Sequence, residues 1–187
     1  MRLHIDYYVH GTTIHNEQKL STGWCDIALS ALGLKQTHEA ATVLSMQNYD
    51  AIFSSDLLRA KQTAKILFNS QSVKLHSDRR LRECNYGALE GKPSHYVNYS
   101  NHIEVAFPDG ECLMDVQKRV SDFLSELLQK NMTHVAIVAH RAPQLALEVI
   151  TNNKSWVDAI AEDWRKVGKW QLGWHYCVEQ SMLNQCR

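Results

Sequence analysis

The stretch VAIVAHR, residues 135–141, decides the fold class of this chain. It consists of an uninterrupted apolar run that is followed at once by a histidine and an arginine. Such a run is typical of a central parallel strand that helices cover on both faces. The two polar residues would then lie beyond the carboxyl end of the strand, which is where open α/β sheets bind their ligands.

Strand-like and helix-like segments alternate along the rest of the chain. We expect strands at residues 3–9, 50–54, 73–76, 135–139 and 170–178, the last one at an edge of the sheet. We expect helices from Ser30, as the N-cap, to about Gln47, at 57–68 with Ser55 or Asp56 as the cap, at 112–130, from about Pro143, and near 155–165. This order predicts a three-layer α/β/α architecture with a mostly parallel central sheet. Residues 77–111, by contrast, are predicted to be irregular.

Composition excludes several classes of protein. The 187 residues are 44% hydrophobic and 21% charged, which predicts one globular domain over residues 1–187. The 20 Lys and Arg residues balance the 20 Asp and Glu residues, so no nucleic-acid partner is expected. Five widely spaced cysteines without a CxxC motif argue against a disulfide framework. With neither a signal peptide nor a membrane span in the sequence, we expect a cytoplasmic protein; its oligomeric state stays open.

The predicted strand ends bring chemically active residues to one edge of the sheet. These residues are His10 with Gly11, Arg59 after the second strand, and His140 with Arg141. A neutral imidazole is a competent nucleophile toward phosphorus, and a phosphoryl transition state needs cationic donors around its oxygens. A carboxylic acid would also be needed for the leaving oxygen, and Glu83 and Glu90 are candidates. Taken singly, each of these residues could equally be structural or solvated.

Six segments, in this order, resemble the histidine phosphatase superfamily, which is also called phosphoglycerate-mutase-like. They are HGTTIHN at 10–16, TGWCDIALS at 22–30, SSDLLRAKQTA at 54–64, LRECNYGALEG at 81–91, PDGEC at 108–112 and VAH at 138–140. Any one of them is a weak signal, but their shared order makes the resemblance specific.

The resemblance implies roles for individual residues. His10 matches the phosphorylated nucleophile, Glu83 matches the proton donor, and Arg59 and His140 match residues of the phosphate pocket. Further candidates for substrate binding are Gly11, Asn16, Thr22, Gly23 and Arg141. The implied activity is hydrolysis of a small phosphomonoester, a phosphorylated metabolite, without a metal or a cofactor.

The chain departs from the family pattern on both sides of this predicted site. The family places arginine before the nucleophile, whereas this chain has Val9; after the second histidine the family commonly has glycine, whereas this chain has Arg141. Loss of one transition-state donor typically costs about 10²–10³ in rate. We hypothesise that Arg141 replaces the lost charge, although it could instead face solvent or pair with an acidic residue.

Two other functions stay open on the sequence alone. A member without the first arginine could bind a phosphorylated metabolite and turn it over weakly or not at all. A phosphoglycerate-type mutase is less favoured, because residues 92–107 contain one Lys and no Arg to hold a substrate carboxylate. In the tail, Trp156, Trp164, Trp170 and Trp174 are interpreted as core residues, with a roof over the pocket as the alternative.

Overall fold

A five-stranded sheet in the order β3-β2-β4-β1-β5 forms the middle of the protein. The computed structural model describes residues 2–44, 47–168 and 172–184. The strands are β1 (Arg2–Val9), β2 (Ala51–Ser55), β3 (Leu75–Asp78), β4 (His134–Ala139) and β5 (Trp174–Glu179). All neighbours pair in parallel except β1 and β5, which are antiparallel. The mostly parallel sheet and the edge strand near the carboxyl end are as the sequence predicts.

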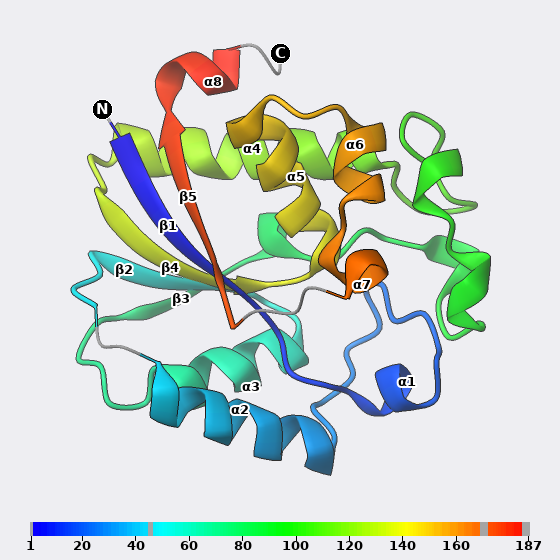
Figure 1. Cartoon of the computed structure of the whole chain (residues 1–187), viewed down its shortest axis with the longest axis horizontal. Helices are drawn as coiled ribbons and strands as arrows, with labels where there is room; N and C mark the ends of the chain where they lie inside the picture. Colours follow the sequence, from blue (N-terminus) through cyan, green and yellow to red (C-terminus); the bar gives the residue numbers. More distant parts are fainter. Residues whose placement is uncertain (1, 45–46, 169–171, 185–187) are drawn as a thin grey trace.

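Helices cover both faces of this sheet (Figure 1). One face carries α2 (Ala31–Val43) and α3 (Leu58–Leu67), and the other carries α4 (Leu113–Gln129) and α5 (Arg141–Asn152). The shorter helices are α1 (Ile14–Glu17), α6 (Trp156–Ala161), α7 (Trp164–Val167) and α8 (Gln180–Asn184). The connection from β3 to α4 contains only 3-10 turns, namely η1 (Arg79–Leu81), η2 (Gly87–Leu89), η3 (Ser94–Tyr96) and η4 (Tyr99–Asn101). The predicted three-layer α/β/α architecture is therefore confirmed.

Alternation along β1 divides the core into two clusters. Leu3, Ile5 and Tyr7 are buried with α4 and α5, whereas Tyr8 is buried on the opposite face with α3. Val9 continues the first set and packs against the α4–α5 cluster. Position 9 therefore faces the layer that contains α5.

Helix α2 ends earlier and packs less than the sequence suggests. It stops at Val43 rather than near Gln47. Leu32 and Val43, two apolar residues of this helix, are 47% and 72% exposed. The buried residues of this helix are Gly33 and Thr37, because the helix closely approaches the loop after β1.

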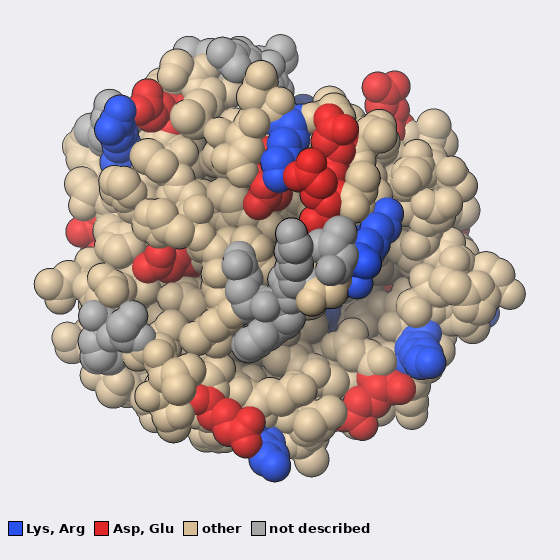
Figure 2. Space-filling view, in the orientation of Figure 1, with Lys and Arg blue, Asp and Glu red and all other residues tan. Residues whose placement is uncertain are grey.

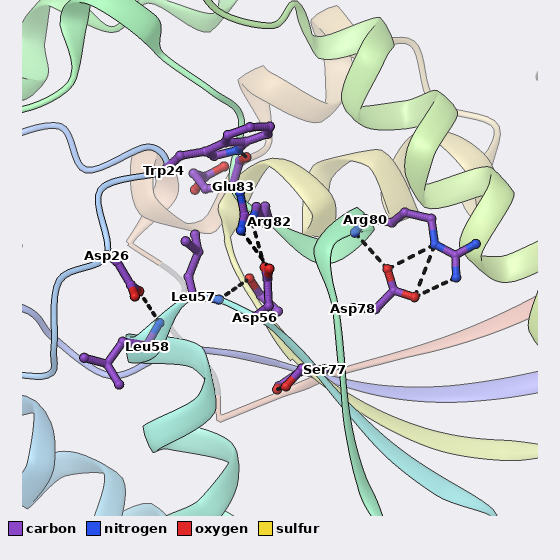
Figure 3. A network of polar contacts seen from close by, with 12 residues as sticks. Trp24, Asp26, Asp56, Leu57, Leu58, Ser77, Asp78, Arg80, Arg82 and Glu83 are labelled. Carbon is purple, nitrogen blue, oxygen red and sulfur yellow. Dashed lines mark hydrogen bonds and ion pairs between the residues drawn. The ribbon is translucent and has the colours of Figure 1, made fainter.

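The predicted cap of α3 is wrong for a physical reason. The helix starts at Leu58, its N-cap is Leu57, and this residue provides no side-chain cap. Instead Asp26, from a distant loop, accepts the Leu58 N–H at 2.6 Å (Figure 3). Asp56 is engaged elsewhere, by a bidentate ion pair with Arg82 at 2.7 Å.

Four other boundaries differ from the prediction. Helix α5 begins at Arg141, before Pro143, because proline is tolerated in a first turn. The helix expected near 155–165 is two short helices, α6 and α7, and the second is capped by Asp163. Strand β3 lies two residues later than predicted, at 75–78 rather than 73–76. β5 begins at Trp174, and Trp170 lies outside the described residues.

The surface and the helices agree with a globular protein of balanced charge. Figure 2 shows Lys and Arg interspersed with Asp and Glu over the face that it draws. Within the described part of the chain, no helix has both the length and the apolar character that a membrane span requires.

Candidate active site

Parallel pairing of β1 with β4 brings the two predicted histidines together. Val9 pairs with Ala139, so His10 and His140 leave the sheet side by side, and their ring centroids are 5.0 Å apart. A cavity of about 1090 Å³ opens at this carboxyl edge of the sheet. His140 is fully buried. The other predicted site residues line the cavity: His10, Gly11, Asn16, Thr22, Gly23, Arg59, Glu83 and Arg141.

The contacts of His10 define which ring nitrogen is available. Nδ1 lies 2.7 Å from the Gly11 carbonyl oxygen, and Arg59 Nε donates to Nε2 at 3.3 Å. Since a carbonyl only accepts, Nδ1 carries the proton and Nε2 carries the lone pair. Burial, with the nearby charge of Arg59 as the second cause, lowers the pKa of His10 to about 3. The imidazole is therefore neutral near pH 7, and its Nε2 carries a lone pair that is chemically able to act as a nucleophile.

Two backbone carbonyl groups hold the guanidinium of Arg59 in place. Its guanidinium donates to the carbonyl oxygens of Gly23 at 2.7 Å and Cys25 at 2.9 Å, and the residue is only 1% exposed. On its own helix, Thr63 donates to the Arg59 carbonyl and accepts the Gly11 N–H, which ties Arg59 to the loop of the nucleophile. A buried guanidinium fixed in this way is a preorganised anion donor.

The loop at residues 22–26 supplies those carbonyls because Glu90 holds it in place. Glu90 accepts the Trp24 N–H at 2.6 Å and the Cys25 thiol at 3.2 Å. Gly23 has φ +51°, and a Cβ there would lie 2.3 Å from the Glu90 carboxylate. Glu90 is therefore a structural residue of the site, and Glu83 is the acid candidate that lies in the cavity.

Gly11 borders the cavity and also lies directly against helix α2. A Cβ at this position would lie 2.5 Å from Thr37 Oγ1 and 3.0 Å from the Gly33 carbonyl oxygen. The loop after His10 thus passes directly against α2. The Asn16 side chain accepts from Thr13 and caps α1, while the residue also borders the cavity.

His140 is a buried imidazole with both ring nitrogens free. Neither Nδ1 nor Nε2 has a hydrogen-bond partner among the described residues. Burial, followed by the charge of Arg59, places the pKa of His140 well below its ordinary value, so the ring is neutral. Its backbone is held firmly, since Tyr7 Oη accepts from the His140 N–H and donates to its carbonyl. An unpaired buried donor 5.0 Å from the nucleophile's ring is suited to an incoming anion.

Glu83 lies over the first turn of α5. Its Oε1 accepts from the N–H groups of Cys84 at 2.9 Å and Ala142 at 3.0 Å and from the Tyr99 hydroxyl at 3.3 Å. Its Oε2 has one such contact, with the Arg141 N–H at 3.2 Å. The less engaged Oε2 is therefore the oxygen that can carry a transferable proton.

Two residues hold the Glu83 backbone from either side. Trp24 Nε1 donates to the Glu83 carbonyl at 2.7 Å, and Arg119 donates to the same oxygen at 2.9 Å. Figure 3 shows the Trp24 indole beside Glu83, and the guanidinium carbon of Arg82 lies 4.9 Å from the indole centroid. The indole N–H of Trp24 thus helps to fix the backbone of the acid candidate.

Arg141 pairs with an acidic residue, which was one of the alternatives left open by the sequence. Its Nε donates to the fully buried Asp163, and its guanidinium carbon lies 4.3 Å from the centroid of Tyr99. The residue nevertheless borders the cavity. The hypothesis that it replaces the charge missing at Val9 remains a proposal.

The carboxyl-terminal segment contributes cavity residues, including two tryptophans for which a roof over the pocket was the alternative prediction. Trp164 and Trp174 lie with their ring centroids 5.7 Å apart, and both border the cavity. Trp156 instead donates to Gln117 within the core. Arg165 is exposed and also borders the cavity. Its place depends on the break between α6 and α7, which no periodicity signals.

The site contains titratable groups but no metal cluster in the part of the chain that the structure describes. In residues 2–44, 47–168 and 172–184, no group of at least three His, Cys, Asp or Glu side chains is arranged to hold a metal ion. The positive charge available to an anion in the cavity is that of the arginines.

These features define a two-histidine, arginine-lined site at the carboxyl edge of a parallel sheet, and the comparison with known families identifies it. The family model of the histidine phosphatase superfamily (branch 1) matches residues 9–152. The chain belongs to this superfamily.

Several named relatives share part of the sequence. Fructose-2,6-bisphosphatase TIGAR of Xenopus tropicalis is 37% identical over 129 residues, which cover 63% of this chain and 47% of the relative. The probable phosphoglycerate mutase GpmB of Yersinia pestis is 31% identical over 132 residues, which cover 64% of this chain and 60% of the relative. The chain thus matches about half the length of the Xenopus protein.

Solved structures extend the similarity to the whole fold. Mycobacterial glucosyl-3-phosphoglycerate phosphatase in complex with VO3 superposes with a TM-score of 0.72 at 29% identity, covering 86% of both chains. The α-ribazole phosphatase of Shigella flexneri gives a TM-score of 0.71 at 25% identity, covering 86% of this chain and 84% of that one.

Proposed function

We propose that this chain is a phosphatase that hydrolyses a phosphomonoester through a phosphohistidine at His10. The observation that carries the proposal is the neutral imidazole of His10. Its protonated Nδ1 is fixed on Gly11, and its Nε2 lone pair lies in a cavity beside a buried arginine. Similarity to proteins named as phosphatases supports the same reaction class.

In the first step, the Nε2 lone pair forms a bond to phosphorus while the bond between phosphorus and the leaving oxygen breaks. Protonated Glu83 gives its proton to that oxygen, so an alcohol leaves and Glu83 becomes a carboxylate. Arg59 and His140 donate to the phosphoryl oxygens as charge moves onto them. The imidazole keeps its Nδ1 proton and carries the positive charge of the phosphorylated ring.

In the second step, water is the acceptor. The Glu83 carboxylate takes one proton from the water as its oxygen bonds to phosphorus, and the bond between phosphorus and Nε2 breaks. The products are inorganic phosphate, neutral His10 and protonated Glu83, which restores the starting state. Because cationic side chains supply the charge stabilisation, we propose that no metal or cofactor takes part, and that activity persists in EDTA.

The size of the cavity bears on the substrate. Ligand sites commonly measure about 300–1,000 Å³, and this cavity of about 1090 Å³ has Leu20, Val43 and Val97 among its apolar residues. The sequence predicts a small phosphomonoester; a cavity of this size would also admit one with a larger, partly apolar leaving group.

A second candidate function is favoured by one observation. Val9, directly before the nucleophile, puts an apolar side chain in the cavity where a donor could stand. A protein of this kind could bind a phosphorylated metabolite without turnover. Covalent labelling separates this candidate from the phosphatase.

The test is a phosphoenzyme assay on wild type, His10→Ala and His38→Ala, with a panel of phosphomonoesters labelled on phosphorus. We expect acid-labile, base-stable label on wild type and on His38→Ala, whose residue is exposed on α2 and does not itself line the cavity. We expect none on His10→Ala, and release of inorganic phosphate rather than transfer to a second hydroxyl. Label that persists in His10→Ala, or wild type without label or turnover on any ester, would contradict the phosphatase.

A further inference from the structure

The cavity has a cation that the proposed mechanism does not use, and it comes from the short helix α7. Arg165 is the second residue of this helix and borders the same cavity as His10 and Arg59. Its guanidinium carbon lies 4.2 Å from the ring centroid of Trp164, which also borders the cavity. Among the described residues, the Arg165 guanidinium forms no ion pair, so its charge is available to a ligand.

Arg165 lies close enough to the two histidines to affect their electrostatics. Burial and the charge of Arg59 are larger causes, but the charge of Arg165 also lowers the pKa of both His10 and His140. Since Arg165 and His10 also border the same cavity, the positive charge of Arg165 can act on an anion that is bound there.

The apolar side chain at position 9 leaves one side of the predicted phosphoryl site without a donor. Val9 packs toward the cluster that contains Ala142 of α5, so it occupies the α5 side of the strand end. Arg59 approaches from the opposite layer, on α3. Arg141 and Arg165 are the cavity arginines that belong to the layer of α5 and α7.

Asp163 contacts both of these arginines, but it binds the guanidinium of only one of them. Its Oδ2 accepts from Arg141 Nε, and its Oδ1 accepts the Arg165 N–H at 3.0 Å as the cap of α7. The side chain of Asp163 is completely buried. Arg141 is thus held through its guanidinium by an ion pair, whereas the Arg165 guanidinium, among the described residues, contacts only the face of the Trp164 ring and keeps its N–H groups available to a ligand.

We propose that Arg165 is the second guanidinium of the phosphoryl site, that it binds the phosphoryl oxygens on the side of Val9, and that Asp163 is its positioning residue. The inference rests on the proposed function of the cavity as a phosphoryl site. It assigns to α7 a role in anion binding, and it makes the ion pair of Arg141 with Asp163 part of the support for that helix.

The test measures affinity for inorganic phosphate by calorimetry, which needs no turnover. Arg165→Ala is expected to weaken phosphate binding about 10- to 100-fold, the usual range for a lost hydrogen bond to a charged group. Arg165→Lys should recover part of this loss, because it keeps the charge and loses the planar fork. Lys166→Ala is the matched control, since it removes the same charge from the next residue of α7, which is exposed and does not border the cavity.

A rescue variant tests whether an arginine at position 9 can take the place of Arg165. In the Arg165→Ala background, Val9→Arg should restore phosphate affinity to within about threefold of wild type, because it supplies a guanidinium on the same side of the site. The Val9→Lys change in that background should restore less. This pattern separates replacement of a specific donor from a general effect of positive charge.

The outcomes distinguish the inference from the proposed function. Phosphate affinity of Arg165→Ala within twofold of wild type would overturn the inference, and so would an equal loss in Lys166→Ala. Wild type that binds phosphate through Arg165 but turns over no ester would support the inference and contradict the phosphatase. Wild type without measurable phosphate binding would overturn both.

Discussion

Replacement of His140 by leucine is expected to make the protein more stable and nearly inactive. The imidazole is fully buried, and neither ring nitrogen has a partner among the described residues. An unsatisfied buried polar group costs about 1–3 kcal/mol, and leucine fills a similar volume without one. The backbone contacts of position 140 are made by Tyr7 Oη and do not depend on the side chain. We therefore expect the free energy of unfolding to rise by about 1–3 kcal/mol.

The same change removes a donor from the predicted transition state. Loss of one such donor typically lowers the rate about 10²–10³-fold, so kcat/KM should fall by that factor while stability rises. Urea unfolding gives the free energy, with an unchanged m-value as the check on the fold. Steady-state kinetics on the phosphomonoester with the highest turnover gives the rate.

A matched control is available on α4. Ser121 also has a buried side-chain oxygen without a partner among the described residues, and it does not border the cavity. Ser121→Ala should therefore stabilise the protein and leave kcat/KM within about twofold of wild type. If His140→Leu lowered the free energy of unfolding, or kept full activity, the interpretation of this imidazole as an unpaired donor reserved for substrate would be wrong.

Three further predictions test the rest of the site. Arg59→Ala should lower kcat/KM by at least about 10²–10³-fold. In contrast to His140→Leu, it should also destabilise the fold, because two backbone carbonyls lose their donor. If urea unfolding gave the same stability as wild type, the interpretation that these carbonyls hold Arg59 would be wrong. Trp24→Phe removes the indole donor to the Glu83 carbonyl. It should lower kcat about fivefold and shift the pH profile of kcat, with KM little changed. A change in KM alone would assign Trp24 to substrate binding instead. The pKa of His10 is about 3 in the folded protein, against 6.5 ordinarily. Between these values only the unfolded chain takes up this proton. Stability should therefore fall as pH drops below 6.5, at most by about 1.4 kcal/mol per pH unit for this group, and the fall should be smaller in His10→Asn when unfolding is compared at pH 7 and pH 5.

The parts of the fold that depend on local pattern could be predicted from the sequence. Alternation at residues 3–9 and the apolar run at 135–139 place β1 and β4, and parallel pairing then brings His10 and His140 together. The resemblance adds Arg59 and Glu83, and both border the cavity. The pairing of the two histidines needs only the period of a strand and the direction of a parallel sheet.

Contacts between distant segments could not be predicted in the same way. Asp26 caps α3 from 32 residues away, and the Trp24 indole reaches the Glu83 carbonyl across 59 residues. Neither contact leaves a periodic signal, since each depends on how irregular loops meet. Arg165 was missed for a related reason: the buried Asp163 caps a separate short helix, and this helix brings an exposed arginine to the border of the cavity.

The contact between Arg59 Nε and His10 Nε2 has a consequence for the resting protein. The lone pair that would attack phosphorus is already occupied by an N–H donor at 3.3 Å. In the resting protein this contact therefore shields Nε2 of His10 from protons and from other electrophiles. An anion whose oxygens compete for that same N–H draws the guanidinium to itself and bares the lone pair as it arrives. The reactivity of the imidazole would then depend on whether the cavity is occupied, without any movement of the sheet.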